Sequence, residues 1–157
     1  MIEEIYTYFT IEMIFMWLNL GVLPFWFVLI VFPQSQICRV FITSIFPIFI
    51  LSLAYGYLLY FFFYEGYDFV RNFELYLGLN AVSNLFTDKA FIILFWLHFL
   101  AMNLFCGGWI VKDSQKFGIN KVLLSFPILI TYFIGPIGLT LYWIIRIFYA
   151  KRINLYD

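Results

Sequence analysis

Long apolar stretches constrain the fold of this chain more than any other feature. Four of them reach the roughly 18 to 20 residues that cross the hydrocarbon core of a bilayer, namely residues 13–32, 40–63, 90–111 and 122–145. In hydrocarbon, backbone polar groups must pair within their own segment or in a closed sheet, and four strands are too few to close a membrane barrel. The stretches therefore predict transmembrane α-helices.

The composition excludes a soluble domain. Charged residues make up 11% of the chain and hydrophobic residues 65%, whereas soluble domains have about 25% charged and about 45–50% apolar residues. The lipid bilayer is therefore the expected surrounding. Nine basic and nine acidic residues cancel, so there is no basic excess to attract nucleic acid, and no nucleic-acid partner is expected.

The lengths of the connections predict how the helices are joined. Residues 33–39 and 112–121 are short connections, and each predicts an antiparallel helical hairpin. Residues 64–89 are longer and carry apolar side chains at a helical period, which predicts a short helix at the membrane interface. That helix could anchor the chain or cover a ligand. The expected fold is all-α: a polytopic, single four-helix membrane domain over residues 1–157, with the short interfacial helix between the second and third spans.

Basic residues do not decide the sidedness of four spans. The side of the N-terminus would carry five of them and the opposite side four, a difference too small for the positive-inside rule. The five are Arg71, Lys89, Arg146, Lys151 and Arg152, and the four are Arg39, Lys112, Lys116 and Lys121. The acidic N-terminal segment with Glu3 and Glu4 is unlike a signal or transit peptide. A bacterial inner membrane is the expected location, and a plastid membrane is the alternative for a eukaryotic source.

His98 is the main candidate for chemistry. It is the only histidine and lies near the middle of the third stretch, where an ionisable group is costly and therefore a functional candidate. A neutral imidazole hydrogen-bonded to a neighbouring helix is the alternative. Cys38 and Cys106 resemble small hydrophobic residues. The sequence shows no ligand cluster or cofactor motif, so we expect neither metal nor cofactor.

Other polar and aromatic residues of the spans are candidates for contacting a ligand. Aromatic side chains would line a cleft suited to a lipophilic polyene or isoprenoid, although lipid-facing aromatics would look the same. Two of these polar residues have a purely structural alternative. Asn103 could instead make an interhelical hydrogen bond, and Arg146 could instead extend its guanidinium toward the headgroups. The candidate ligand-binding residues are Asn19, Trp26, Trp96, Asn103, Trp109, Tyr142 and Arg146.

Several segments resemble a known family. WLHFLAMNLFCGGWIVKD at residues 96–113 and GPIGLTLYWIIR at 135–146 are similar to the abscisic-acid-deficient-four-like family of neoxanthin-synthase-related integral membrane proteins. The likeness extends to NLGVLPFWFVLIVFP at 19–33 and LAYGYLLY at 53–60. The resemblance implies four membrane helices. Because plant members are required for neoxanthin synthesis, it also implies binding or isomerisation of a carotenoid, specifically a xanthophyll epoxide.

The resemblance also implies a reaction type. The epoxide would open while a proton leaves a neighbouring carbon, which gives an allene and a hydroxyl with no net redox change. Such an isomerase needs an acid and a base but no cofactor. His98, in the W-x-H-x-L pattern of the family, would transfer the proton. Asp113, at the end of the same segment, would orient the reacting groups or relay the proton.

A non-enzymatic role is the second hypothesis. The residues show no complete catalytic set, so the chain could instead be a small helical subunit or assembly factor of a larger membrane complex, or form a homo-oligomer. A transporter or channel would need more polar residues within the membrane than these stretches contain.

Overall fold

The structure is a computed structural model that describes residues 10–151 and 153–154. Glu3, Glu4 and Arg152, which entered the expectations on location and sidedness, lie outside the described residues. Every regular element in the described part is helical, with no strand. The all-α prediction is confirmed for this part of the chain.

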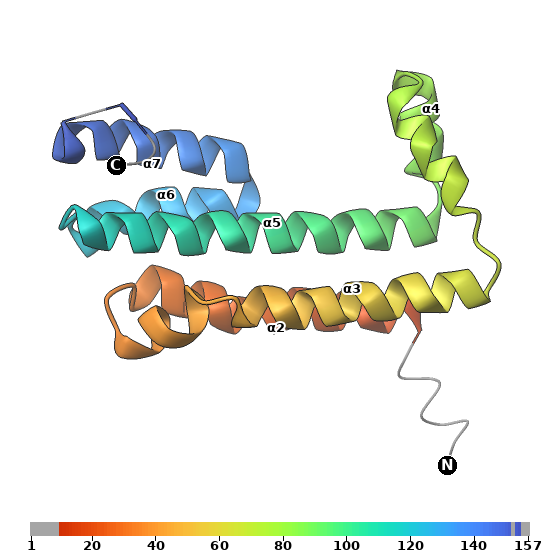
Figure 1. The fold of residues 1–157 in the computed structure, drawn as a ribbon, viewed down its shortest axis with the longest axis horizontal. Helices are drawn as coiled ribbons and strands as arrows, with labels where there is room; N and C mark the ends of the chain where they lie inside the picture. Colours follow the sequence, from red (N-terminus) through yellow and green to blue (C-terminus); the bar gives the residue numbers. More distant parts are fainter. Residues whose placement is uncertain (1–9, 152, 155–157) are drawn as a thin grey trace, which may run out of the picture. The chain divides into compact units, whose positions relative to one another are not determined.

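Three helices are long and apolar enough to cross a membrane, as judged by length and composition (Figure 1). They are α2 (Ile11–Val31), α3 (Phe46–Tyr64) and α5 (Lys89–Lys116). α3 begins later than residue 40 because the chain first forms the π-helical turn η1 (Cys38–Ile42). The hydroxyl of Ser44 then accepts a hydrogen bond from the backbone N–H of Phe46 at 3.1 Å, which satisfies a free donor at the start of α3.

The fourth expected span, residues 122–145, is wrong as a single helix. The structure has two helices there, α6 (Lys121–Phe133) and α7 (Gly135–Ala150), separated by Ile134 in an extended conformation (φ −140°, ψ 82°). Pro136 lies in the first turn of α7, where its ring and missing N–H end the preceding helix. At about 1.5 Å per residue, the two helices are roughly 20 and 24 Å long, short of the ~30 Å hydrocarbon core. Figure 1 shows α7 returning alongside α6.

Glycine allows α6 and α7 to pack this closely. A Cβ on Gly138 would overlap the backbone nitrogen and the Oγ1 of Thr131. The Thr131 hydroxyl donates to the carbonyl of Pro127 within α6 at 2.7 Å, so it occupies the space beside Gly138 in a defined rotamer. The hairpin therefore depends on the absence of a side chain at residue 138.

The connection between α3 and α5 contains two short helices. The first, η2 (Phe69–Tyr76), is a 3-10 helix that begins where the Asp68 carboxylate accepts from the N–H of Val70 at 3.0 Å. It confirms the expected short helix, whereas its place at a membrane interface stays a prediction. The second, α4 (Leu79–Leu85), was not predicted; it follows Gly78, whose φ of 129° excludes most other residues.

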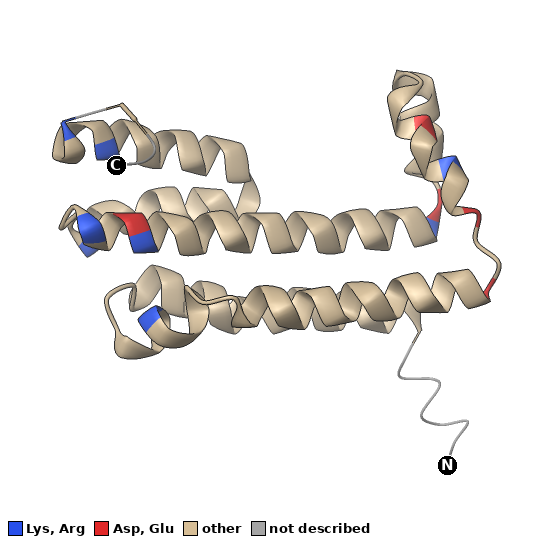
Figure 2. Cartoon of the chain, in the orientation of Figure 1, with Lys and Arg blue, Asp and Glu red and all other residues tan. Residues whose placement is uncertain are grey.

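The described chain divides into two compact units. The first unit comprises the described residues up to Leu20 together with Ile50–Leu100, and the second comprises Gly21–Phe49 and the residues from Ala101 onward. Leu58 and Leu97 are buried in the first unit, and Val22 and Ile128 in the second. In Figure 2, acidic residues prevail in the first unit and basic residues in the second. The single-domain interpretation and the pairing of the first two spans stay predictions.

Candidate functional site

A cavity of about 390 Å³ in the first unit contains the main candidate residue, His98. α5 contributes His98, Phe91, Leu94 and Phe95; α3 contributes Tyr55 and Leu59; and η2 contributes Asn72 and Leu75. The His98 side chain is exposed and makes no hydrogen bond within the described residues. The imidazole is therefore accessible on a wall that is otherwise mostly leucine and aromatic.

Asn72 is another polar group with a free donor at this cavity. Its Oδ1 accepts a hydrogen bond from the Tyr67 hydroxyl at 2.7 Å, while its NH₂ group makes no bond within the described part of the chain. Burial, with a further contribution from the Asp88 carboxylate, raises the pKa of Tyr67. The phenol thus stays a donor near neutral pH and orients the Asn72 amide, leaving its NH₂ available to a ligand oxygen.

Asn19 and Trp96, in the same unit, bond to each other. The Trp96 Nε1 donates to the Asn19 Oδ1 at 3.0 Å, and the Asn19 Nδ2 donates to the carbonyl of Phe15 at 2.7 Å. The Phe15 and Trp96 rings are 5.8 Å apart. These contacts join α2 to α5, and neither residue lines the cavity that contains His98. Their assignment to ligand binding stays a prediction.

Asp113, Tyr142 and Arg146 form a buried polar cluster in the second unit. The Asp113 Oδ2 accepts from the Tyr142 hydroxyl at 2.6 Å and from the Arg146 Nε at 2.7 Å. Arg146 is only 1% exposed, and its Nη1 donates to the carbonyl of Asn154 at 2.9 Å. Burial and the neighbouring carboxylate raise the pKa of Tyr142, which keeps the phenol protonated as a donor. The Trp109 ring packs edge-on to Tyr142 at 5.8 Å.

Asn103 replaces a hydrogen bond that Pro136 cannot make. In a continuous helix the N–H of residue 136 would bond to the carbonyl of Tyr132, but proline has no N–H. The Asn103 Nδ2, from α5, donates to that carbonyl instead at 3.4 Å. A Cβ on Gly135 would overlap the Asn103 Oδ1, so Gly135 leaves room for the amide. Asn103 thus supports the break between α6 and α7, while its assignment to ligand binding stays a prediction.

Trp26 lies close to this break. Its six-membered ring occupies the space beside Gly107, where an added Cβ would come within 2.9 Å. The Tyr132 ring lies 5.3 Å away in an edge-on arrangement. The indole Nε1 of Trp26 is buried and makes no hydrogen bond within the described residues. This N–H is able to donate a hydrogen bond to an oxygen of a ligand or a water. The assignment of Trp26 to ligand binding stays a prediction.

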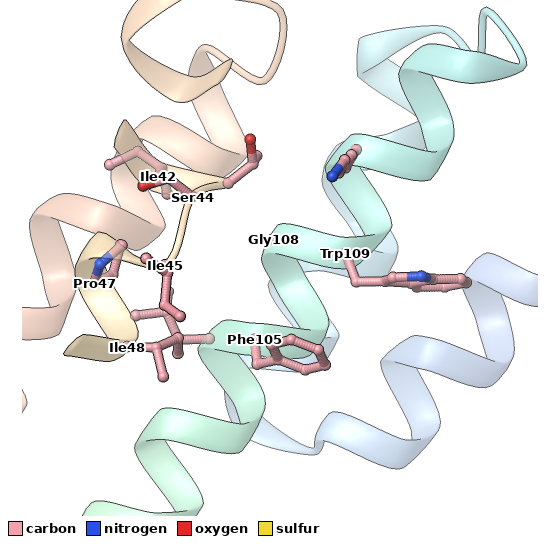
Figure 3. A pocket seen from close by; sticks show the side chains of 11 residues that line it. Ile42, Ser44, Ile45, Pro47, Ile48, Phe105, Gly108 and Trp109 are labelled. Atoms are coloured by element: carbon pink, nitrogen blue, oxygen red, sulfur yellow. The ribbon is translucent and has the colours of Figure 1, made fainter. Parts of the chain in front are cut away.

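A second cavity, of about 350 Å³, lies in the second unit between residues 42–48 and the C-terminal half of α5. Figure 3 shows Ile45 and Ile48 across from Phe105 and Gly108. The lining is mainly apolar, and Lys112 is its one charged residue. Trp109 belongs to this lining and also packs on Tyr142, so one wall of the cavity rests on the buried cluster of Asp113, Tyr142 and Arg146.

The structure brings together only some of the predicted site residues. Asp113, Trp109, Tyr142 and Arg146 are neighbours within the second unit, whereas His98 belongs to the first unit. No group of three or more His, Cys, Asp or Glu side chains that could hold a metal occurs in the described range. The two predicted catalytic residues thus have different surroundings: His98 is exposed at a cavity, and Asp113 is engaged in two hydrogen bonds.

The family model described as ABA DEFICIENT 4-like matches residues 13–142. The chain belongs to the ABA DEFICIENT 4-like family. The match confirms the resemblance noted from the sequence and, together with the length and composition of α2, α3 and α5, indicates a membrane protein. Neither the curated proteins nor the solved structures contain a match.

In this ABA DEFICIENT 4-like chain, sequence reasoning missed the residues that complete both cavities. Tyr55 and Asn72 accompany His98 in the first, and Ile42, Ser44 and Lys112 belong to the second. These residues come from different helices and connections, so no spacing in the sequence groups them. The one feature of the sequence that could have pointed to a lining residue was the polar Asn72 within an apolar helical period.

Proposed function

We propose that this protein binds a carotenoid-like isoprenoid in the cavity of the first unit and isomerises a xanthophyll epoxide there, with His98 as the proton-transfer group. Membership of the ABA DEFICIENT 4-like family links the chain to carotenoid and xanthophyll pathways. The observation that carries the proposal is the exposed imidazole of His98 on an aromatic and leucine-lined cavity. A bacterial inner membrane, or a plastid membrane for a eukaryotic source, is the proposed location.

The lining suits the oxygen-bearing end of a long conjugated ligand. The rings of Tyr55, Phe91 and Phe95 offer flat apolar surfaces to a polyene chain. The free NH₂ of Asn72, the hydroxyl of Tyr55 and the imidazole of His98 are the lining groups able to bond an epoxide or hydroxyl oxygen. A mostly apolar pocket with few polar groups is the usual form of a small-molecule site, because the polar groups orient a ligand that apolar contacts hold.

The isomerisation needs no redox partner. One carbon–oxygen bond of the epoxide breaks, the oxygen gains a proton and becomes a hydroxyl, and a neighbouring carbon loses a proton as the allene forms. Since one proton is gained and one lost, an imidazole can accept and donate in the same turnover. Asp113 does not line this cavity. Its carboxylate accepts hydrogen bonds from Tyr142 and Arg146, and the role proposed for it is to orient those two side chains.

The first measurement is the visible spectrum of protein purified in mild detergent from a carotenoid-producing host, with mass analysis of the extracted pigment. We expect a stoichiometric polyene. A colourless protein that co-purifies with a membrane partner would overturn the ligand proposal and favour the non-enzymatic subunit.

The second measurement is turnover of a xanthophyll epoxide. His98→Ala should lower the rate by roughly 10²- to 10⁴-fold, the usual effect of a positioned acid–base group, while pigment remains bound. Met102→Ala is the matched control, because Met102 lies one turn further along α5, is exposed, and lines neither cavity. Full activity of His98→Ala would contradict the assignment of His98.

A further inference from the structure

The return of α7 changes which charged residues share one end of the second unit. Arg146, near the end of α7, pairs with Asp113, near the C-terminal end of α5, at 2.7 Å. Its Nη1 also bonds the carbonyl of Asn154, which follows α7. The end of α7 therefore lies beside the end of α5. An unbroken fourth span would instead have carried Arg146 to the other side of the membrane.

Charge is unevenly divided once this return is taken into account. The described basic residues of the second unit are Arg39, Lys112, Lys116, Lys121, Arg146 and Lys151, and its one described acidic residue is Asp113. The first unit has Glu12, Glu65, Asp68, Glu74 and Asp88 against Arg71 and Lys89. A helix that crosses a membrane has its two ends on opposite sides, so the charges near the start and the end of α5 can be compared by the positive-inside rule.

We propose that the C-terminal end of α5 faces the cytoplasm, that its basic residues meet anionic lipid headgroups there, and that the cavity beside Lys112 takes a chain of an anionic phospholipid. Cytoplasmic segments carry an excess of Lys and Arg, and the cytoplasmic leaflet is negatively charged. The proposal goes beyond the proposed function, since it concerns the other unit and another ligand.

The lining of the second cavity supports an amphiphilic occupant. Ile45, Ile48 and Phe105 provide apolar contacts for a chain (Figure 3). The hydroxyls of Thr43 and Ser44 already donate to backbone carbonyls of their own segment, at 3.0 and 2.6 Å. Lys112 is exposed and makes no ion pair within the described residues. An apolar cavity beside a cation is complementary to a lipid that joins a hydrocarbon chain to a phosphate.

Cysteine accessibility tests the sidedness. In a Cys38→Ala/Cys106→Ala background, single cysteines are introduced as Glu65→Cys, Lys121→Cys and Lys151→Cys and exposed to a membrane-impermeant maleimide on spheroplasts of a bacterial host. We expect labelling at 65, and labelling at 121 and 151 only after permeabilisation. Different labelling at 121 and 151 would show an unbroken fourth span. Labelling of residues 121 and 151 on intact spheroplasts, with residue 65 labelled only after permeabilisation, would show the opposite orientation. Either result overturns the proposal.

Lipid retention tests the cavity. Wild-type protein is moved from nanodiscs of phosphatidylglycerol and phosphatidylcholine into mild detergent, and the lipid that remains bound is counted by native mass spectrometry. We expect preferential retention of phosphatidylglycerol and a roughly fivefold loss in Lys112→Ala, the effect of one basic residue at an anionic headgroup. Lys121→Ala is the matched control because Lys121 lies outside the cavity. Equal retention of both lipids, or equal loss in both variants, would overturn the cavity assignment.

Discussion

The contact between Gly138 and Thr131 gives the sharpest test of the hairpin formed by α6 and α7. In Gly138→Ala, the added Cβ would overlap the backbone nitrogen and Cα of Thr131 as well as its Oγ1. Backbone atoms cannot rotate away, so the two helices would have to separate. Overpacking typically costs about 1–3 kcal/mol, and we expect the upper end, about 3 kcal/mol.

The gain from replacing glycine within a helix offsets part of this cost. Alanine is favoured over glycine by about 1 kcal/mol in a helix interior, so the net loss should be about 2 kcal/mol. For a chain of 150 to 250 residues this corresponds to a fall in Tm of roughly 4–8 °C. The assay is thermal unfolding in mild detergent at one scan rate, because unfolding of such proteins is often irreversible.

Gly21→Ala is the matched control, because Gly21 lies inside α2 and a Cβ there would meet nothing within 4 Å. We expect its Tm to stay the same or to rise. The reasoning would be refuted if Gly138→Ala were as stable as the wild type, or if Gly21→Ala lost as much as Gly138→Ala.

Three further predictions follow from single contacts. Arg146→Met should destabilise the protein by about 3–5 kcal/mol, because it leaves the largely buried Asp113 carboxylate without its cation. In a double-mutant cycle of unfolding, the variant that carries both Arg146→Met and Asp113→Asn should lose less stability than the sum of the two single variants. Full additivity would argue against an interaction between Asp113 and Arg146. Asn103→Ala should cost about 1 kcal/mol, because it removes the long bond to the Tyr132 carbonyl, and Gly135→Ala should lower Tm less in this background than in the wild type; equal effects would show that Gly135 does not make room for the amide. Burial raises the pKa of Cys38 to about 11, so the thiolate forms only as pH rises toward that value. In a Cys106→Ser background, a thiol reagent should therefore react with Cys38 far more slowly at pH 7 than after unfolding in SDS, with the rate increasing about tenfold per pH unit; rapid labelling of the folded protein at pH 7 would contradict this.

The helices that rest on local sequence were the most predictable part of the fold. Apolar runs give α2, α3 and α5, and the apolar period of residues 69–77 gives η2. The site was less predictable. The sequence singled out His98 as the one histidine, but Tyr55 and Asn72, which share its cavity, come from other elements. The pairing of Asp113 with Tyr142 and Arg146 joins residues about 30 positions apart, and no local pattern encodes that separation.

By itself, the sequence determined that this chain is helical and belongs in lipid, because backbone groups in hydrocarbon must bond within their own segment. Only the tertiary structure decided what happens at Pro136. A proline in an apolar run can kink a helix or end it, and the sequence around it does not distinguish the two. Here Asn103 bonds the carbonyl that Pro136 leaves free, and Thr131 fits against Gly138. Those partners come together only when the chain has folded, and with them the expected fourth span becomes a hairpin.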